Sequence, residues 1–231
     1  MSKIALITGA NKGIGYAVAE ALAHDNWRVL VGARDRGRGL EATERLLTQG
    51  YAAEFVELDI TDASTIAAAA SEVRSLVGHV DVLVNNAGGI LPGDGDILTL
   101  TSDVLLGTLE LNTLGALQVT QAFWPLLLES KDARVINVSS LGGSLANMAS
   151  WSPAYCISKA ALNAVTVQLA HAGQAHGISV NAVCPGWVRT DAGGPDAPRS
   201  PEQGAAIVVK LATQTNPPTG GYWNDAGAIA W

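Results

Sequence analysis

Short runs of apolar residues alternate along the chain with longer segments in which apolar residues recur every three or four positions. The short runs end near glycine, asparagine, aspartate, serine or proline and are typical of buried parallel strands, whereas the longer segments are typical of helices packed on a sheet. The pattern predicts strands at residues 3–8, 27–32, 53–58, 80–84, 134–138 and 178–183, with a weak strand near 220–223. It predicts helices at residues 16–22, 41–47, 102–129, 153–171 and 201–212, and an alanine-rich helix that reaches residue 77.

The regular alternation of strand and helix, with short connections, indicates a doubly wound α/β fold with right-handed crossovers. We therefore predict a Rossmann-type parallel sheet of about seven strands with helices on both faces, which makes a three-layer sandwich. No linker, low-complexity segment or repeat divides residues 1–231, so one domain is expected. Residues 90–100 and 139–151 are expected to be loops.

The composition narrows the classes of function. Hydrophobic residues make up 48% of the chain and charged residues 15%, which excludes disorder, and the net charge of −7 argues against a nucleic-acid partner. Two cysteines and four histidines have no metal-ligand spacing, so we expect no metal centre and a reducing compartment. No apolar run suits a signal peptide or a membrane span, and a cytoplasmic protein is expected.

A glycine pattern follows the first predicted strand. Gly9, Gly13 and Gly15 form Gly-x-x-x-Gly-x-Gly between a strand and a helix. Glycines at this place let the backbone approach a pyrophosphate, whose charge is stabilised by free amides at the helix N-terminus. The alternative is a glycine-rich turn without a ligand, but the position after the first strand favours a nucleotide site.

The end of the second predicted strand bears on the choice of nicotinamide cofactor. Arg34 can form a fork to the 2′-phosphate of NADP, and Lys12 in the glycine loop can add a second positive charge. Asp35 lies 20 positions past Gly15 and could instead bond the ribose 2′-hydroxyl of NAD. We interpret Asp35 as the N-cap of the next helix, so the sequence predicts NADP(H).

Tyr155 and Lys159 lie four residues apart on a predicted helix for which Ser152 and Pro153 are the expected N-cap and first residue. The spacing places both side chains on one helix face. An ammonium beside a phenol lowers the pKa of the phenol and makes it a better proton donor near neutrality. The alternative is that Tyr155 anchors the helix in the core and Lys159 is a solvated surface charge.

Taken together, these motifs resemble those of the short-chain dehydrogenase/reductase family over essentially the whole chain. The resemblance rests on residues 8–15, residues 85–88, Asn112, Ser139 with Ser140, Tyr155 with Lys159, and Pro185 with Gly186. Residues 11–15, 33–35 and 184–191 are similar in particular to the NADPH-dependent carbonyl reductases.

The resemblance implies a reduction of a ketone or aldehyde by hydride transfer from the nicotinamide ring. Tyr155 would transfer the proton at the substrate oxygen, while Lys159 would lower the Tyr155 pKa and bond the nicotinamide ribose. Asn112 would help to hold a water that relays protons to Lys159. The alternative for Asn112 is an asparagine in the middle of a helix that faces solvent.

The carbonyl-polarising serine departs from the family pattern. In the family it usually lies thirteen residues before the tyrosine, whereas Ser140 lies fifteen residues before Tyr155, so the intervening loop is two residues longer. A loop can absorb such an insertion, and we therefore predict Ser140 in this role, with Ser139 and Ser144 as lesser candidates.

The resemblance also implies the ligand-binding residues. Asp59 would contact the adenine amino group, residues 86–88 would pack along the adenosine ribose, and the segment from Pro185 would hold the nicotinamide carboxamide. The expected cofactor-binding residues are Gly9, Asn11, Lys12, Gly13, Ile14, Gly15, Arg34, Asp59, Ile60, Asn86, Ala87, Gly88, Tyr155, Lys159, Pro185, Gly186, Val188 and Thr190.

The substrate pocket is expected to be apolar. Its predicted walls are Ile90, Leu91, Leu145, Trp151 and Trp187, with Tyr222, Trp223 or Trp231 nearby, and residues 190–200 as a lid. Tryptophan on pocket loops favours an apolar or aromatic ketone or aldehyde; the alternative is that these tryptophans are core and interface residues.

Three functions are compatible with the residues: an NADPH-dependent carbonyl reductase, an NAD(P)-dependent alcohol dehydrogenase working in the oxidative direction, and a non-catalytic dinucleotide sensor. A sensor is expected to lose the serine, tyrosine or lysine, and all three are present. The chain lacks the long insertion that monomeric carbonyl reductases carry before the tyrosine helix. Its helices from residues 102 and 153 are apolar, so we expect a homodimer or homotetramer.

Overall fold

The computed structural model describes residues 2–231 and is built on one eight-stranded sheet with the strand order β3-β2-β1-β4-β5-β6-β7-β8. All neighbouring strands are parallel except β7 and β8. The strands are β1 (Ile4–Thr8), β2 (Arg28–Ala33), β3 (Ala53–Glu57), β4 (Val82–Asn85), β5 (Arg134–Val138), β6 (Ser179–Val183), β7 (Tyr222–Asn224) and β8 (Gly227–Ala228). The predicted doubly wound Rossmann-type fold is confirmed.

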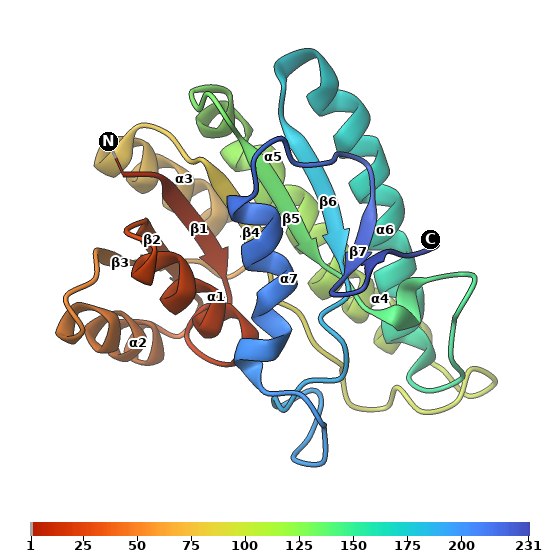
Figure 1. Cartoon of the computed structure of the whole chain (residues 1–231). Coiled ribbons are helices and arrows are strands. Elements are labelled where there is room, and N and C mark those ends of the chain that lie inside the picture. Colours follow the sequence, from red (N-terminus) through yellow and green to blue (C-terminus); the bar gives the residue numbers. More distant parts are fainter. Residues whose placement is uncertain (1) are drawn as a thin grey trace.

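Helices cover both faces of this sheet (Figure 1). One layer holds α1 (Gly13–His24), α2 (Arg36–Thr48) and α7 (Pro201–Thr213), and the other holds α3 (Ala63–Val77), α5 (Gly115–Leu128) and α6 (Pro153–Gly173). Alternate residues of β2 explain the two cores, because Val29 and Val31 pack with the first layer and Leu30 with the second. Within residues 2–231, no helix is both long enough and apolar enough to cross a membrane.

The eighth strand was not expected. β8 is only two residues long and pairs with β7 in an antiparallel hairpin. The side-chain oxygen of Asn224 accepts the amides of Ala226 at 2.9 Å and Gly227 at 3.1 Å, which turns the chain back on itself. The last residues therefore run back across β7.

The helix predicted at residues 102–129 is continuous but contains a π-helical segment. α4 (Ser102–Leu109) passes through η1 (Glu110–Leu114) into α5, and Pro125 lies inside α5 without ending it. In η1, Thr113 Oγ1 donates to the carbonyl of Ser158 on α6 at 2.8 Å, and Asn112 is only 1% exposed. The alternative of a solvent-facing Asn112 is therefore wrong, and the π-helical segment instead directs it at α6.

The N-terminus of α6 is capped by a residue distant in sequence. Pro153 is at the first helical position, as expected, but Ser152 has φ +43° and ψ +67° and its side chain caps nothing. The carboxylate of Asp94 instead accepts the amides of Ala154 at 2.8 Å and Tyr155 at 2.9 Å. Ser152 thus occupies the predicted N-cap position, but the carboxylate of Asp94 and not the Ser152 side chain makes the capping hydrogen bonds.

Candidate active site

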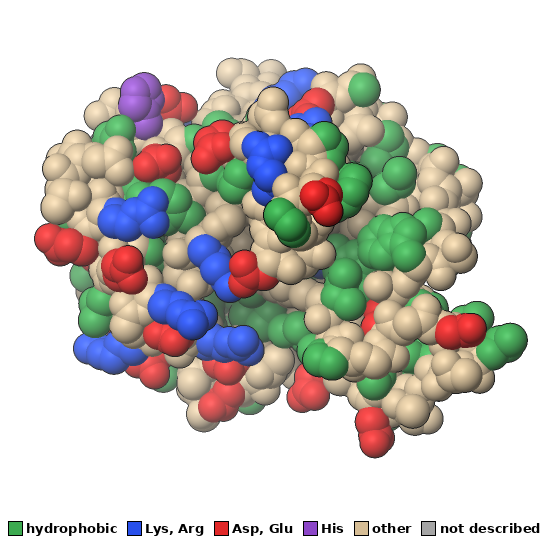
Figure 2. All heavy atoms as spheres, turned by 90° about the horizontal axis from the view of Figure 1, so that it is seen from below, with side chains coloured by type: hydrophobic (Ala, Val, Ile, Leu, Met, Phe, Trp, Pro, Cys, Tyr) green, Lys and Arg blue, Asp and Glu red, His purple; other side chains and the backbone are tan. Residues whose placement is uncertain are grey.

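The predicted site residues lie at the carboxyl edge of the sheet, where the parallel strands end together. Figure 2 looks onto this edge from below the view of Figure 1. Lys and Arg side chains gather in its left half, on the side of β2 and α2, whereas large hydrophobic side chains gather in its right half. Asp and Glu side chains lie among these Lys and Arg side chains, so this edge has a charged region of both signs beside an apolar one.

The glycine loop after β1 is locked against the loop after β4. Thr8 Oγ1 accepts the amides of Asn86 and Ala87, each at 3.0 Å, and Asn86 Nδ2 donates to the Thr8 carbonyl at 2.9 Å. Gly9 has φ +64°, and a Cβ atom placed on Gly15 would lie 2.5 Å from the Gly9 carbonyl oxygen. Only glycine fits this turn, which keeps the backbone open to a ligand.

The N-terminus of α1 fits an anionic group. Lys12 occupies the N-cap position with an extended backbone, and its side chain makes no capping bond to the first amides of the helix. These free amides and the positive end of the helix dipole point toward the carboxyl edge. The side chain of Lys12 itself pairs with Asp191, and this hydrogen bond lowers the pKa of the Asp191 carboxyl.

At the end of β2, Asp35 accepts the backbone amide of Arg38 at 3.0 Å and is the N-cap of α2. This confirms its interpretation as a cap. Arg34 is exposed at the strand end, with its guanidinium available to a ligand. Asp59, at the end of the next strand, uses one carboxylate oxygen to accept the amide of Thr61 at 2.9 Å and its hydroxyl at 2.7 Å.

The segment after β6 returns to the glycine loop. Pro185 is buried, Gly186 has φ +80°, and Val188 forms an isolated bridge with Arg199. A Cβ atom placed on Gly13 would lie 3.3 Å from Thr190 Cγ2, so residues of the two predicted nucleotide-binding segments meet.

Tyr155 and Ser140 meet on the other side of this edge. Burial raises the pKa of Tyr155 to about 12, against a smaller lowering by a hydrogen bond from Ser140. Lys159, which is 4% exposed, has its pKa lowered to about 8 by burial. Its Nζ lies 5.6 Å from the centroid of the Tyr155 ring and donates to the Val138 carbonyl at 2.9 Å. The expected lowering of the Tyr155 pKa by Lys159 is not met in the chain alone, because burial dominates.

Asn112 connects the loop after β4 to α6. Its Nδ2 donates to the Gly89 carbonyl at 2.8 Å and to Ser158 Oγ at 3.0 Å, and its Oδ1 accepts the Gly89 amide at 2.8 Å. A Cβ atom placed on Gly88 would lie 2.6 Å from Asn112 Oδ1 and 3.4 Å from Lys159 Nζ. The structure thus brings Asn112, Gly88 and Lys159 together.

The loop after β5 absorbs its extra length beyond Ser140. Residues Leu141–Gly143 form a 3-10 turn packed on α6, where a Cβ atom on Gly143 would lie 2.7 Å from the carbonyl carbon of Lys159. The lesser candidates are engaged elsewhere: Ser139 Oγ donates to the Lys159 carbonyl at 3.4 Å, and Ser144 Oγ donates to the Ala230 carbonyl at 2.9 Å. Among the three serines, Ser140 alone is paired with Tyr155.

The predicted pocket walls differ in their burial. Ile90, Leu145, Trp151 and Trp187 are all exposed at this edge, and Trp151 stacks on Tyr155 with ring centroids 5.7 Å apart. Tyr222 is instead 1% exposed and lies behind Ser140, so it does not line a pocket. Residues 190–200 are folded back, with Trp187 Nε1 donating to the Gly193 carbonyl at 2.7 Å.

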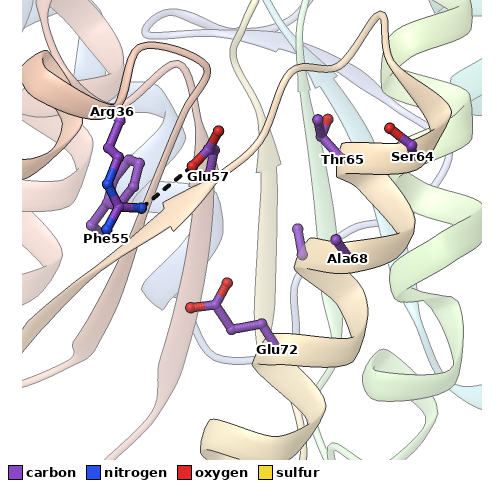
Figure 3. Close-up of a pocket in the computed structure, with 8 residues that line it drawn as sticks. Arg36, Phe55, Glu57, Ser64, Thr65, Ala68 and Glu72 are labelled. Carbon is purple, nitrogen blue, oxygen red and sulfur yellow. Dashed lines mark hydrogen bonds and ion pairs between the residues drawn. The ribbon is translucent and has the colours of Figure 1, made fainter.

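A pocket of about 320 Å³ lies at the outer edge of the sheet, between β3, α2 and α3 (Figure 3). Arg36 crosses it to Glu57 at 3.4 Å, with Phe55 beneath. The lining contains none of the predicted site residues. We therefore place the candidate site at the carboxyl edge and not in this pocket.

Sequence reasoning missed Asp94 and Asp191. Asp94 lies in a loop that was predicted only as a pocket wall, 61 positions before the amide of Tyr155 that it binds. Asp191 lies 179 positions from its partner Lys12. No local pattern in the chain pointed to either pairing.

The chain is similar to known proteins over most of its length. A family model described as short chain dehydrogenase matches residues 3–200. The chain is 32% identical to (+)-neomenthol dehydrogenase of Arabidopsis thaliana, covering 91% of each protein. It is 33% identical to carbonyl reductase (NADPH) 1 of Oryctolagus cuniculus, covering 91% of this chain and 90% of that protein.

Solved structures give the same result. The NADPH-bound carbonyl reductase from chicken fatty liver has a TM-score of 0.90 at 28% identity, covering 100% of this chain and 99% of that one. Salutaridine reductase from Papaver somniferum has a TM-score of 0.86 at 28% identity, covering 96% of this chain and 99% of that one.

Proposed function

The chain belongs to the short-chain dehydrogenase/reductase family, and from this premise we propose that it is an NADPH-dependent carbonyl reductase with one catalytic domain. The observation that carries the proposal is the meeting of the Tyr155 phenol with the Ser140 hydroxyl beside Lys159, at the sheet edge that holds the glycine loop. Two hydroxyl groups from different elements thereby lie close together, as the binding of one carbonyl oxygen by both requires.

Each residue has a distinct task in this proposal. Ser140 donates a hydrogen bond to the substrate carbonyl oxygen and stabilises the negative charge that develops there. Tyr155 delivers the proton to the same oxygen and becomes a phenolate. The buried ammonium of Lys159 stabilises that phenolate, and Asn112 orders the loop at Gly89 next to it.

NADP(H) fits the residues at the charged half of the edge. The free amides of α1 and the cradle at Gly9 and Gly15 suit a pyrophosphate, and exposed Arg34 suits a 2′-phosphate. When bound, the cofactor would supply the hydride for the carbonyl carbon. The cap formed by Asp35 supports this preference, because a carboxylate oxygen that already accepts the Arg38 amide is a poorer partner for a ribose hydroxyl.

The substrate we propose is an apolar or aromatic ketone or aldehyde. Trp151, which stacks on Tyr155, supports it, as do the exposed Trp187 and Leu145 on loops at the same edge. Oxidation of an alcohol is the second candidate, favoured by the relative named as a dehydrogenase, because the same groups run the reaction in reverse. We also propose a homodimer or homotetramer through α6 and the continuous helix α4-η1-α5, where Leu106, Leu114 and Leu128 are exposed.

The decisive test follows NADPH and NADH absorbance with 4-nitrobenzaldehyde as the carbonyl probe. Tyr155→Phe removes the proton donor while it keeps the ring on Trp151, so kcat should fall about 100-fold or more. Undiminished turnover by Tyr155→Phe would refute the assigned proton donor. A lack of NADPH turnover by the wild type over a panel of carbonyl compounds would refute the reductase assignment itself.

A further inference from the structure

The chain end packs directly behind the residue predicted to polarise the carbonyl. The hydroxyl of Tyr222, the first residue of β7, donates a hydrogen bond to the backbone carbonyl of Ser140. Trp231 stacks on the Tyr222 ring, with centroids 5.4 Å apart and an interplanar angle of 13°. Ser140 is therefore held by a buried tyrosine 82 positions later in the chain.

The same segment also holds the lengthened part of the loop. Ile229 donates its amide to the Tyr222 carbonyl at 2.8 Å, which leads residues 229–231 back past β7. The Ala230 carbonyl then accepts the Ser144 hydroxyl at 2.9 Å, and the Trp231 carbonyl accepts the Ala146 amide at 3.3 Å. These bonds fall in residues 144–151, beyond the turn that packs on α6.

Tyr222 is chemically suited to be a fixed donor. Burial raises its pKa well above the usual range of a phenol, so the hydroxyl remains protonated and donates at any physiological pH. Its ring has few rotatable bonds and is confined by Trp231. The Ser140 carbonyl accepts this hydroxyl together with the Gly143 amide at 2.7 Å. The two bonds restrain the peptide plane that follows the Ser140 Cα, and so they limit the directions open to the serine hydroxyl.

We propose that Tyr222 is a positioning residue that holds Ser140 in the orientation needed to bond the substrate carbonyl, and that Trp231 fixes Tyr222 and the loop in front of it. This inference rests on the proposed function, in which Ser140 polarises the carbonyl. Tyr222 acts through Ser140 alone, which separates it from the residues that contact substrate.

The test is a double-mutant cycle of Tyr222→Phe and Ser140→Ala in the full chain, with NADPH and 4-nitrobenzaldehyde. Tyr222→Phe keeps the ring and its stacking but removes the donor. We expect kcat to fall about 10-fold, because small displacements of a positioned group cost this much or more, while the Kd for NADPH stays within about twofold. In the Ser140→Ala background the same substitution should leave kcat unchanged.

Two further measurements test whether the effect is specific to Tyr222 and whether the variant is folded. Tyr51→Phe is the matched control, since Tyr51 lies against His24 at a distance from this loop, and it should retain the wild-type kcat. Urea unfolding should show that Tyr222→Phe folds cooperatively, with a midpoint only slightly below that of the wild type, as expected for one lost buried hydrogen bond.

The outcomes distinguish the role of Ser140 in the proposed function from the role of Tyr222 in positioning it. Wild-type turnover by Ser140→Ala would overturn the role of Ser140 in the proposed function. An inactive Ser140→Ala with an unaffected Tyr222→Phe, or equal losses from Tyr222→Phe in both backgrounds, would overturn the positioning role alone. If Tyr222→Phe does not fold, Trp231→Ala takes its place in the cycle. A decrease in kcat of about threefold or more that occurs only when Ser140 is present supports the inference. An equal decrease in the wild-type and Ser140→Ala backgrounds overturns it.

Discussion

The carboxylate of Asp94 accepts the backbone amide of Tyr155 at 2.9 Å. Its other oxygen accepts the Ala154 amide at 2.8 Å, and since Pro153 has no amide hydrogen, Asp94 takes the first two free donors of α6. A negative charge is thereby placed at the positive end of the helix dipole. The loop after β4 and the helix that carries Tyr155 and Lys159 are held as one unit.

Removal of this cap should affect both stability and turnover. We expect Asp94→Ala to lower the free energy of unfolding by about 1–2 kcal/mol and kcat/KM for the carbonyl probe about 10-fold, because the amides lose their partner and the first turn of α6 loosens. Urea unfolding and NADPH absorbance measure the two effects. Asp96→Ala is the matched control, since Asp96 caps only the Leu98 amide in the same loop. Equal losses of activity in both variants would contradict the assignment.

Burial of Lys159 should make the stability of the cofactor-free protein depend on pH. Burial lowers the pKa of its ammonium from 10.5 to about 8. Between these values the unfolded chain binds more protons than the folded chain, so the contribution of this group to stability rises with pH. The difference in unfolding free energy, wild type minus Lys159→Met, should increase by about 1–3 kcal/mol from pH 7 to pH 10 in urea titrations. A difference that stays constant would show that Lys159 is not desolvated.

Substitutions of Arg34 and Asp35 should have different effects, the first on the choice of cofactor and the second on the capping of α2. Arg34→Ala should raise the KM for NADPH about 10-fold or more, because a charge-assisted fork to the 2′-phosphate is lost, and leave the KM for NADH unchanged. Asp35→Ala should lower stability by about 1 kcal/mol through loss of the bond to Arg38 and leave the ratio of the two cofactors as it is. A switch in cofactor preference by Asp35→Ala would assign the ribose to Asp35.

Arg134 should be important for stability and not for chemistry. Its guanidinium is 2% exposed in β5 and donates to the carbonyls of Leu211, Ala212 and Gln214 at the end of α7, and to Asp132. Arg134→Met should lower the free energy of unfolding by about 3 kcal/mol or more, because it leaves these buried acceptors unpaired. Lys3→Met, which breaks an exposed pair with the same Asp132 at 3.0 Å, should cost less than about 1 kcal/mol. Similar costs in urea unfolding would contradict this difference.

Local patterns predicted most of the fold. The buried strands are runs of apolar residues, and the predicted cap at Asp35 lies directly before its helix, so both signals are contained within a few residues. The π-helical segment at Asn112 and the two-residue strand β8 were not predicted, because each depends on partners outside the segment. Ser152 shows the limit of a local rule, since it occupies the predicted N-cap position but its side chain makes no capping bond.

By itself the sequence determined the elements, their order and the spacings along one element, such as the glycine loop and the single helix turn between Tyr155 and Lys159. Only the tertiary structure decided which side chain caps α6, which tyrosine holds Ser140, and how burial changes the pKa values of Tyr155 and Lys159. The physical reason is the distance along the chain between the residues that interact. Helix and strand patterns arise from neighbours in the chain, whereas the bonds of Asp94 and Tyr222 join residues 60 and 82 positions apart. Desolvation likewise arises from all the elements that close around a group at once.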